Sequence, residues 1–558
     1  MTKARSVHYF VDFLVKKTQK ASLIYVGYIP KNKDGNIYKG ENLCIFDEKS
    51  VNLQPTNPKD IMKKTITLFV VALCCLSAWC GGVKRPRLVV GLVVDQMRWD
   101  YLYYYYDKYG EDGIKRLLSN GYSCNNTMIP YVPTVTAIGH SCVYTGSVPA
   151  FTGIAGNNFM LNGRNVTSVT DPTCHAVGST PDSSDGHCSP RNLLANTIGD
   201  QLKLATDFKS KVISVALKDR AAILPGGHAA DAAYWWDTKA GHFITSDYYM
   251  EKLPRWVEAF NKANHTESGF DIKTSNKGVT MTFKMAESAI TNEHLGKHEE
   301  TDMLAVSISS TDAIGHTYST RGKENYEVYM QLDKDLAHFF RVLDRELGKD
   351  NYLFFLTADH GAVHNGNFLN AHKLPGGGFS SRTKAEEMKA ALASRFGVSG
   401  NYIKEIMDCR IYLDREFISS HGLDYHKVKK AVVEILREDP QFAYVVDYEE
   451  VQNTTLPQFL RERITNGYHS HRSGDIMVVI QGSHMYGTVG PDYKGTSHGT
   501  WNPDDSHIPL IFMGWNVKQG STSTPTFMTD IAATVCAMLH VQMPDCCIGT
   551  AISEVWKE

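Results

Sequence analysis

Six residues of the types that bind transition metals stand out in this chain: Asp95, Asp312, His316, Asp359, His360 and His498. Asp312 and His316 (STDAIGHTYS) are four residues apart, so both can reach one ion if a strand runs there into a turn of helix. Asp359 and His360 (TADHGA) are adjacent, and a loop can direct both into one crevice. Carboxylate and imidazole together suit Zn²⁺, which binds either donor at about 2.0–2.2 Å. Either motif alone is common by chance among 22 histidines, but the whole set predicts a hydrolase with two metal ions.

Short apolar runs precede most of these residues and must position them. Residues 88–94 (LVVGLVV) lead to Asp95, residues 303–309 (MLAVSIS) to Asp312, and residues 352–357 (YLFFLT) to Asp359. None of the runs alternates apolar with polar residues, which is typical of parallel strands that helices cover on both faces. Functional groups gather outside the carboxyl ends of such strands. We therefore expect ligands that are far apart in the sequence to converge at one edge of a sheet.

The rest of the chain supports the same fold class. Strand and helix patterns alternate from about residue 87, and residues 326–347 carry apolar side chains at the three- and four-residue spacing of an amphipathic helix. This alternation predicts an α/β fold with a mostly parallel central sheet between helices. A length of 558 residues allows two or three domains, or one large α/β domain with insertions.

The pattern then loosens, and residues 365–480 are expected to form an insertion or cap. Strand signals return in DIMVVI (475–480) and IPLIFM (508–513), and His498 lies in the glycine-rich loop between them. Residues 527–541 predict a closing helix. We interpret both returning strands as a continuation of the central sheet.

Charge excludes one class of partner. The chain has 58 basic and 60 acidic residues, so its net charge is −2, and it has no stripe of lysines and arginines with interleaved aromatic residues. We therefore expect no nucleic-acid partner. The oligomeric state stays open, and the sequence is compatible with a monomer.

The segment from Met62 (MKKTITLFVVALCCLSAWCGG) has two lysines, an apolar stretch and then small residues, the layout of a secretory signal peptide. The apolar stretch, residues 66–79, is shorter than the about 20 residues that span a membrane. We predict a signal peptide over residues 62–82, translation from Met62, and residues 1–61 as an extension that the natural protein lacks. The protein would be exported to the periplasm without a stable membrane anchor. The alternatives are a cytoplasmic tail with an anchor or, with a poor lipobox (SAW), a lipidated Cys80.

The cysteines after the predicted signal peptide follow no metal-binding pattern. They are Cys124, Cys142, Cys174, Cys188, Cys409, Cys536, Cys546 and Cys547. None has CxxC spacing, so no thiolate zinc site is expected. Export permits disulfides, and a bridge between Cys174 and Cys188, which flank a loop rich in Asp, Ser and Gly, fits the pattern. The sequence alone does not assign the pairing.

Three longer segments carry a family resemblance: residues 93–102 (VVDQMRWDYL), residues 131–159 (YVPTVTAIGHSCVYTGSVPAFTGIAGNNF) and residues 497–514 (SHGTWNPDDSHIPLIFMG). With the DxxxH and DH motifs they resemble the alkaline phosphatase superfamily, where such motifs supply two zinc ions. Within it the chain is similar to the PafA-type (phosphate-irrepressible) bacterial alkaline phosphatases over about residues 87–550. The resemblance implies an alkaline-phosphatase-like catalytic domain from residue 87 to 558.

The resemblance also divides the six ligands between two zinc ions. One ion would be held by Asp312, His316 and His498, and the other by Asp95, Asp359 and His360. In an in-line displacement the attacking and the leaving oxygen lie on opposite sides of phosphorus. Two ions about 3.5–4 Å apart can contact both oxygens at once. The nucleophile would lie between them.

The nucleophile is expected to be Thr136, which would also be a ligand of the zinc ion that Asp95 holds. The family has a threonine before a helix and four residues ahead of a histidine, as in TAIGH here. The free N–H groups at a helix N-terminus favour a phosphoryl group. The other hydroxyl candidates nearby are Thr134, Ser141 and Thr145, and His140, Asp505 and His507 are expected to be structural, with His507 orienting the loop of His498.

Three further residues are expected to bind phosphate. Asn157 in GIAGNNF matches the family's phosphate-binding asparagine, with Asn158 as the neighbour with which it could be confused. Lys218 and Arg220 (VALKDRAAIL) follow the strand KVISVAL and place two cations at its carboxyl end. Such charges stabilise non-bridging phosphoryl oxygens. They favour a phosphate monoester, which has one charge more than a diester.

The implied function is zinc-dependent hydrolysis of phosphate monoesters through a phosphothreonine intermediate on Thr136. A phosphodiesterase or nucleotide pyrophosphatase of the same superfamily is the main alternative, because it shares the zinc ligands and the threonine. A sulfatase lacks support, since no formylglycine motif surrounds Cys142 (CVYTG). A catalytically inactive periplasmic zinc-binding protein is the alternative from another class.

Overall fold

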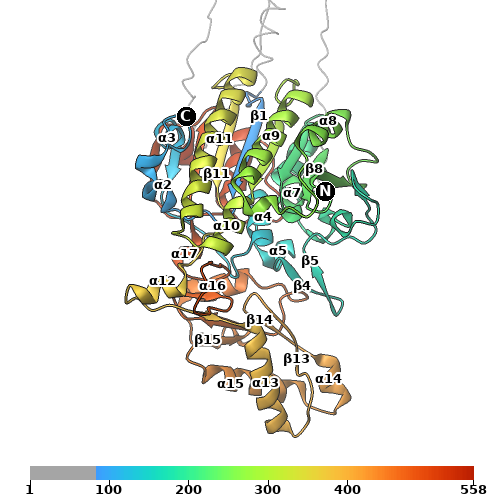
Figure 1. Ribbon diagram of the computed structural model, residues 1–558, viewed down its shortest axis with the longest axis vertical. Coiled ribbons are helices and arrows are strands. Elements are labelled where there is room, and N and C mark those ends of the chain that lie inside the picture. Colours follow the sequence, from blue (N-terminus) through green and yellow to red (C-terminus); the bar gives the residue numbers. More distant parts are fainter. Residues whose placement is uncertain (1–82, 558) are drawn as a thin grey trace, which may run out of the picture. The chain divides into compact units, whose positions relative to one another are not determined.

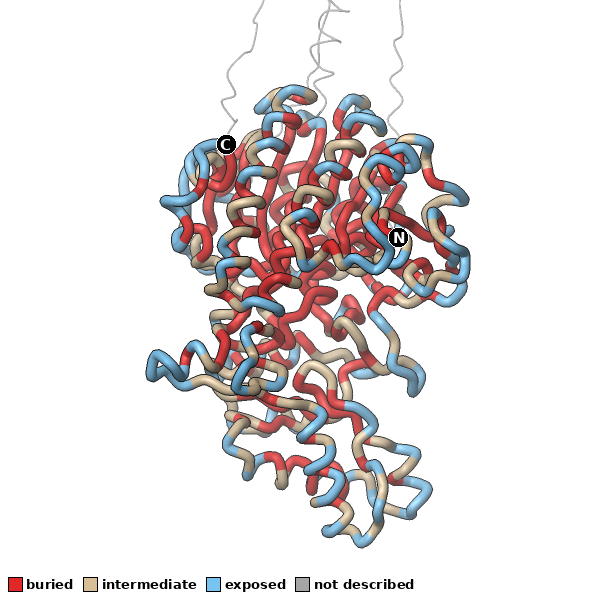
Figure 2. The backbone as a smooth tube through the Cα atoms, in the orientation of Figure 1, coloured by how far each residue is buried: buried red, intermediate tan, exposed pale blue. Residues whose placement is uncertain are grey.

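The computed structural model describes residues 83–557, which are built around a ten-stranded sheet (Figure 1). The neighbouring strands at its centre are parallel, in the order β11 (Tyr352–Thr357), β1 (Leu88–Val94), β10 (Asp302–Ile308), β7 (Val212–Ala216) and β8 (Ala232–Asp237). Every residue of these strands is buried (Figure 2), as their uninterrupted apolar patterns predict.

The register of three central strands brings their carboxyl ends to one level. β1 lies between β10 and β11, with Val94 paired to Ile308 and Val93 paired to Thr357. The residues that follow these strands therefore leave the sheet side by side. This is the arrangement that the apolar runs before Asp95 and Asp359 predict.

The outer strands of the sheet are mostly antiparallel to their neighbours. β19 (Leu510–Gly514) pairs antiparallel with β11 and with β2 (Tyr122–Cys124), which in turn pairs parallel with β20 (Gly520–Thr522). At the other side β9 (His242–Ser246) pairs antiparallel with β8 and β6 (Ala176–Val177). The predicted α/β fold with a parallel centre is thus confirmed, and the sheet as a whole is mixed.

Helices cover the sheet in two groups. One group packs around α4 (Thr136–Thr145) and comprises α6 (Ile198–Ala205), α7 (Asp219–Gly226) and α18 (Asp530–Leu539). The other group is α9 (Asn276–Asn292), α10 (Ser310–Tyr318) and α11 (Lys323–Leu347), of which α9 and α11 lie in front of the sheet in Figure 1. α11 is the amphipathic helix that the apolar spacing predicts.

The region predicted as an insertion builds a second sheet of four strands, ordered β13 (Ile403–Met407), β14 (Arg410–Leu413), β16 (Ile476–Ile480) and β15 (Phe442–Asp447). α13 (Ser381–Phe396) and α15 (Tyr425–Arg437) pack on it, around a separate apolar core. The interpretation of DIMVVI as a strand of the central sheet is therefore wrong, because β16 pairs with β14 and β15 instead.

Other predictions concern the N-terminal segment and the cysteines. The predicted extension and signal peptide lie outside the described residues. Among residues 83–557, no helix combines the length and the apolar character that crossing a membrane requires. The predicted bridge between Cys174 and Cys188 is not formed, since all eight cysteines of this range are free and the Cys188 thiol faces Asp219, with Sγ 3.9 Å from Oδ2.

Candidate active site

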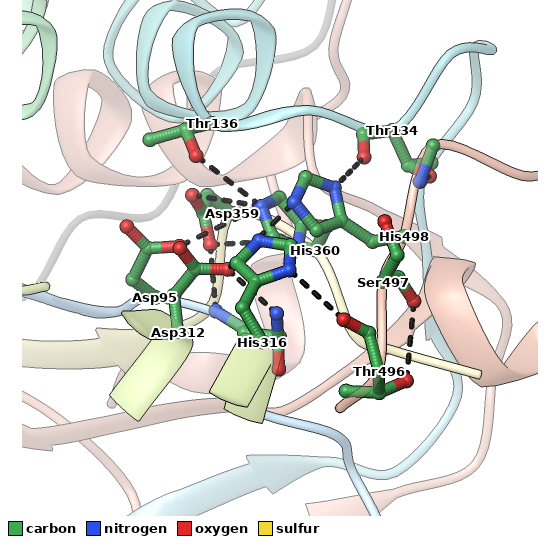
Figure 3. Close-up of polar contacts among 12 residues, drawn as sticks. Asp95, Thr134, Thr136, Asp312, His316, Asp359, His360, Thr496, Ser497 and His498 are labelled. Atoms are coloured by element: carbon green, nitrogen blue, oxygen red, sulfur yellow. Dashed lines mark hydrogen bonds and ion pairs between the residues drawn. The ribbon is translucent and has the colours of Figure 1, made fainter. Parts of the chain in front are cut away.

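The predicted ligands meet at the carboxyl ends of the central strands (Figure 3). Asp95 follows β1, the adjacent Asp359 and His360 follow β11, and Asp312 and His316 lie in the first two turns of α10, directly after β10. His498 reaches the same place from the loop before β19, and Thr136 is the first residue of α4. The strands thus bring together residues from five separate parts of the sequence.

Asp95, Asp359 and His360 form the first ligand group, in which one donor atom of each lies within 4.8 Å of the others. His360 Nε2 is 3.5 Å from Asp95 Oδ1 and 3.4 Å from Asp359 Oδ2. Both of these carboxylate oxygens are buried without a hydrogen-bond partner. Burial and the nearby Asp359 raise the pKa of Asp95 well above its ordinary value. Unpaired buried oxygens beside an imidazole fit a metal cation, which would compensate their charge.

Asp312, His360 and His498 form the second ligand group, again with donor atoms within 4.8 Å. His316 adjoins it, with Nε2 3.1 Å from Asp312 Oδ1 and its ring centroid 5.1 Å from that of His498. The rings of His360 and His498 are stacked at 3.6 Å. His360 therefore lies between the two groups, and the expected partners Asp312, His316 and His498 are adjacent.

Backbone carbonyls fix the orientation of the three imidazoles. Nδ1 of His316 lies 2.9 Å from the carbonyl of Thr496, Nδ1 of His498 lies 2.7 Å from that of Thr134, and Nδ1 of His360 lies 2.9 Å from that of Gly361. A carbonyl can only accept, so each Nδ1 donates and each Nε2 keeps its lone pair for a metal.

Burial lowers the pKa of His360 and that of His498, which keeps both rings neutral, as ligands must be. Burial alone would also lower the pKa of His316, but the carboxylate of Asp312 outweighs burial and raises it. Of these three histidines, only His316 has a raised pKa, and the carboxylate of Asp312 is the cause.

Lys218 joins the two groups. Its Nζ lies 2.6 Å from Asp95 Oδ2, 2.6 Å from Asp312 Oδ2 and 3.4 Å from Thr136 Oγ1. Burial would lower the pKa of Lys218, but Asp312 and Asp95 outweigh burial and hold it above its ordinary value. The lysine therefore carries its charge next to the hydroxyl of Thr136.

Of the four hydroxyl candidates, only Thr136 points at the ligand groups (Figure 3), with Oγ1 3.5 Å from His360 Nε2. Thr134 donates to the carbonyl of Thr500 at 2.9 Å. Ser141 and Thr145 donate to carbonyls of their own helix, at 2.9 and 2.8 Å. Thr136 is the candidate whose hydroxyl faces the ligand groups. It also begins α4, and the dipole at a helix N-terminus favours an anion.

Two of the predicted phosphate-binding residues contact the start of α4: Lys218 reaches the Thr136 hydroxyl, and Asn157 bonds the next residue. Asn157 Oδ1 accepts the N–H of Ala137 at 2.9 Å, so its NH₂ group remains available to a ligand. Asn158 instead bonds Asn165 across the β4 (Asn158–Leu161) and β5 (Arg164–Thr167) hairpin. Arg220 lies in the first turn of α7, and its buried Nε has no hydrogen-bond partner among the described residues.

The loop of His498 is held by Asp505 and not, as expected, by His507. Asp505 Oδ2 accepts the N–H and the hydroxyl of Thr500, both at 2.6 Å, and the hydroxyl of Thr134 at 3.3 Å. Burial raises the pKa of Asp505 to about 7. His507 bonds the carbonyl of Asn125 at 3.0 Å and stacks on Trp99.

Sequence reasoning overlooked Gln96, which contacts aspartates of both ligand groups. A neutral amide has no metal-ligand signature, and its position directly after Asp95 is the only signal that could have found it. His140, expected to be structural, bonds the carbonyl of Thr136 at 2.9 Å and the hydroxyl of Ser307 at 2.7 Å.

Residues 89–501 match the model of the type I phosphodiesterase / nucleotide pyrophosphatase family. The chain belongs to this family. It is 43% identical to the protein named alkaline phosphatase PafA of Elizabethkingia meningoseptica, over 85% of this chain and 95% of that protein.

A protein of Myroides odoratus named calcium-transporting ATPase is also 43% identical, over 88% of this chain and 99% of that protein. The crystal structure of wild-type PafA superposes with a TM-score of 0.82 at 42% identity, covering 86% of this chain and all of that one. The predicted superfamily, the PafA-like fold and the assignment to alkaline-phosphatase-type enzymes are confirmed.

The crystal structure of a PafA variant is 41% identical to this chain, with a TM-score of 0.81. In that variant a threonine, an asparagine, a lysine and an arginine are replaced. The threonine and asparagine have the same spacing there as Thr136 and Asn157 here, and the lysine and arginine the same spacing as Lys218 and Arg220. These four residues are thus similar in type and order to residues that were chosen for substitution in PafA.

Proposed function

We propose that this protein hydrolyses phosphate monoesters to an alcohol and inorganic phosphate, with two zinc ions and Thr136 as the nucleophile. One observation carries the proposal: the hydroxyl of Thr136, at the N-terminus of α4, lies 3.5 Å from His360, the histidine that both ligand groups share. A nucleophile, an anion-binding helix end and two groups of metal ligands therefore meet at one point.

The donor sets fit two ions. Asp95, Thr136, Asp359 and His360 would hold one, and Asp312, His316 and His498 the other. Mixed oxygen and nitrogen donors in sets of three or four, with neutral imidazoles, suit Zn²⁺. When bound, the ions would lower the pKa of the attacking hydroxyl or water and offset charge on the leaving oxygen. The unpaired oxygens of Asp95 and Asp359 support this assignment.

The reaction would take two steps on Thr136. Its oxygen attacks phosphorus as the bond to the alcohol breaks, which leaves a phosphothreonine and, after proton uptake, the free alcohol. Water then attacks phosphorus, returns the threonine hydroxyl and releases phosphate. The NH₂ group of Asn157 is oriented to donate to a phosphoryl oxygen, because Ala137 occupies its Oδ1.

Substrate class depends on charge. A monoester dianion has three non-bridging oxygens, and Lys218, which holds its proton beside Thr136, can bind one of them. Phosphodiester hydrolysis, which the family's description suggests, would leave this lysine facing a substrate with one charge fewer. The kcat/KM values for an aryl phosphate monoester and for its diester decide between them, and a preference for the diester would reverse the proposal. Assays with ATP test the activity that the Myroides odoratus relative's name suggests.

Substitution of the nucleophile tests the two-step path. Thr136→Ala should lower kcat by at least about 10⁴-fold, because a covalent route is lost, while both ions stay bound. Thr136→Ser keeps a hydroxyl and should retain part of the activity. Ser141→Ala, on the same helix but bonded to its own backbone, is the matched control. Undiminished activity in Thr136→Ala would move the nucleophile elsewhere.

We also propose that residues 62–82 direct export to the periplasm and that translation starts at Met62. The layout of charged, apolar and small residues supports this. Mass spectrometry of the N-terminus of the native protein tests it. A peptide from residues 1–61 in the native protein would contradict the start site, and retention of residues 62–82 would contradict cleavage.

A further inference from the structure

Gln96 has an unusual backbone conformation at the edge of the site. It follows Asp95 at the end of β1, is 3% exposed and has a φ of 64°. Residues other than glycine adopt this left-handed region rarely, and they keep it where surrounding contacts require it. The contacts of Gln96 therefore need an explanation.

Gln96 donates one hydrogen bond to each ligand group. Its backbone N–H donates to Asp359 Oδ1 at 3.1 Å, and its side-chain Nε2 donates to Asp312 Oδ1 at 2.6 Å. Asp359 belongs to the first group and Asp312 to the second. The backbone of Gln96 thus contacts one group and its side chain contacts the other. Every substitution except proline keeps the backbone bond, so a substitution tests the side-chain bond alone.

The bond to Asp312 is made to the oxygen that faces the other ligands. Asp312 Oδ1 is 3.1 Å from His316 Nε2 and 3.7 Å from His498 Nε2. A carboxylate oxygen has two lone pairs, so Oδ1 can accept from Gln96 and still bind an ion. An outer hydrogen bond of this kind fixes the direction of a metal ligand.

Gly315 provides independent support from the opposite side. It lies inside α10, between Asp312 and His316, and a Cβ there would be 2.0 Å from Gln96 Oε1 and 3.0 Å from its Cδ. Its φ is not in the left-handed region, so its backbone does not require glycine. The absent side chain makes space for the amide of Gln96.

We infer that Gln96 is a positioning residue that orients Asp312 toward the metal ion of the second ligand group. The inference rests on the proposed two-ion function. It predicts an asymmetry: loss of the side chain weakens one ion, because the backbone bond to Asp359 persists in the first group. Loss of such an outer hydrogen bond typically changes metal affinity about 10–100-fold.

Three variants probe the contact from both sides. Gln96→Gly removes the amide and suits the left-handed backbone, Gln96→Glu keeps the length but replaces the donor with an acceptor, and Gly315→Ala fills the space that the amide occupies. Circular dichroism and Tm of each variant establish that it folds. The readout is the release of zinc from fully loaded protein into excess chelator, with metal content measured per chain.

The parent protein should hold two ions. In each variant one ion should leave about 10–100-fold faster than in the parent, while the other leaves at the parental rate. Gln96→Gly combined with Gly315→Ala should be no faster than the faster single variant, because both changes break the same contact. Parental release of both ions, or equal acceleration of both, would overturn the inference. A parent with fewer than two ions would instead overturn the proposed function on which the inference rests.

Discussion

The two ligand groups differ in how the protein itself treats their carboxylates. In the first group, Asp95 Oδ1 and Asp359 Oδ2 are buried with no hydrogen-bond partner. In the second group, both oxygens of Asp312 have donors, with the Gln96 amide on Oδ1 and the Lys218 ammonium on Oδ2, each at 2.6 Å. Each carboxylate of the first group thus keeps one buried oxygen without a donor from the chain, whereas Asp312 has a donor on both of its oxygens.

The pKa directions differ between Asp95 and Asp312. Burial would raise the pKa of Asp359, but His360 and His140 outweigh burial and lower it. Burial and Asp359 raise the pKa of Asp95, so its ionised form is unfavourable in the metal-free fold. Burial would also raise the pKa of Asp312, but His316 and Lys218 outweigh burial and lower it well below its ordinary value. Two carboxylates at one sheet edge therefore have opposite effects on stability, because Asp95 faces another carboxylate and Asp312 faces His316.

Among the changes that test this comparison of the two groups, metal removal should have the largest effect on activity. Chelation should lower kcat/KM at least about 10³-fold, because the ions supply several kcal/mol of charge stabilisation. Release should have two phases, and the faster phase should come from the second group, which has one carboxylate where the first has two. Asp312→Asn should remove the faster phase. Zinc should restore activity in the parent, whereas a single release phase would erase the difference between the groups.

The lysine between the groups should come next. Lys218→Ala should lower kcat/KM for an aryl phosphate monoester about 10²-fold, because a buried cation beside Thr136 is lost. The diester should lose less than the monoester, since it has one charge fewer. Lys209→Ala, an exposed lysine shortly before β7, is the control and should change neither substrate. Equal losses for both esters would remove the charge argument for monoesters.

Stability of the metal-free protein should separate Asp95 from Asp312 by sign. A raised carboxyl pKa means that stability falls as pH rises above the unfolded value near 4, so Asp95→Asn should raise the free energy of unfolding at pH 8 by about 1–2 kcal/mol. A lowered pKa contributes stability above that value and loses it as pH falls, so Asp312→Asn should lower the free energy by about 1–2 kcal/mol. Urea titration of chelated protein measures both, and changes of equal sign would contradict the comparison.

The smallest effect is expected from a change at Ser307, which contacts the first ligand group only through His140. Ser307 bonds His140, which lies 3.3 Å from Asp359 Oδ2. Ser307→Ala should lower the free energy of unfolding by about 1 kcal/mol, because a buried ring nitrogen loses its partner, and should leave the release of both ions unchanged. Faster release of the second group's ion alone would show that the groups are not separate.

Sequence reasoning succeeded where burial and local order carry the information. The runs before Asp95 and Asp359 are apolar throughout because both faces of their strands are covered, and polar residues at their ends can only meet at the sheet edge. The same reasoning failed for Ile476–Ile480, since an apolar run does not say which sheet it joins. It also could not show that β19 runs antiparallel to β11.

Within the site, residue type predicted candidates, while side-chain direction decided among them. Asp505 and His507 both follow His498 within nine residues, yet only Asp505 turns toward Thr500. Gln96 was invisible for the opposite reason, because its amide has no chemistry of its own and acts only through its contact with Asp312. The role of a residue that acts through its contact with another side chain can be recognised only in the folded structure.

The pairing of β19 with β11 also sets a sequence of events during synthesis. The whole second sheet lies between these strands in the chain, so the ribosome completes that sheet before the partner of β11 emerges. Until then β11 has an unpaired edge, which is open to association with other chains, and His498 is made only shortly before β19. Chains that end before residue 498 would therefore lack one ligand of the second group. They would also expose the unpaired edge of β11, which favours aggregation and degradation.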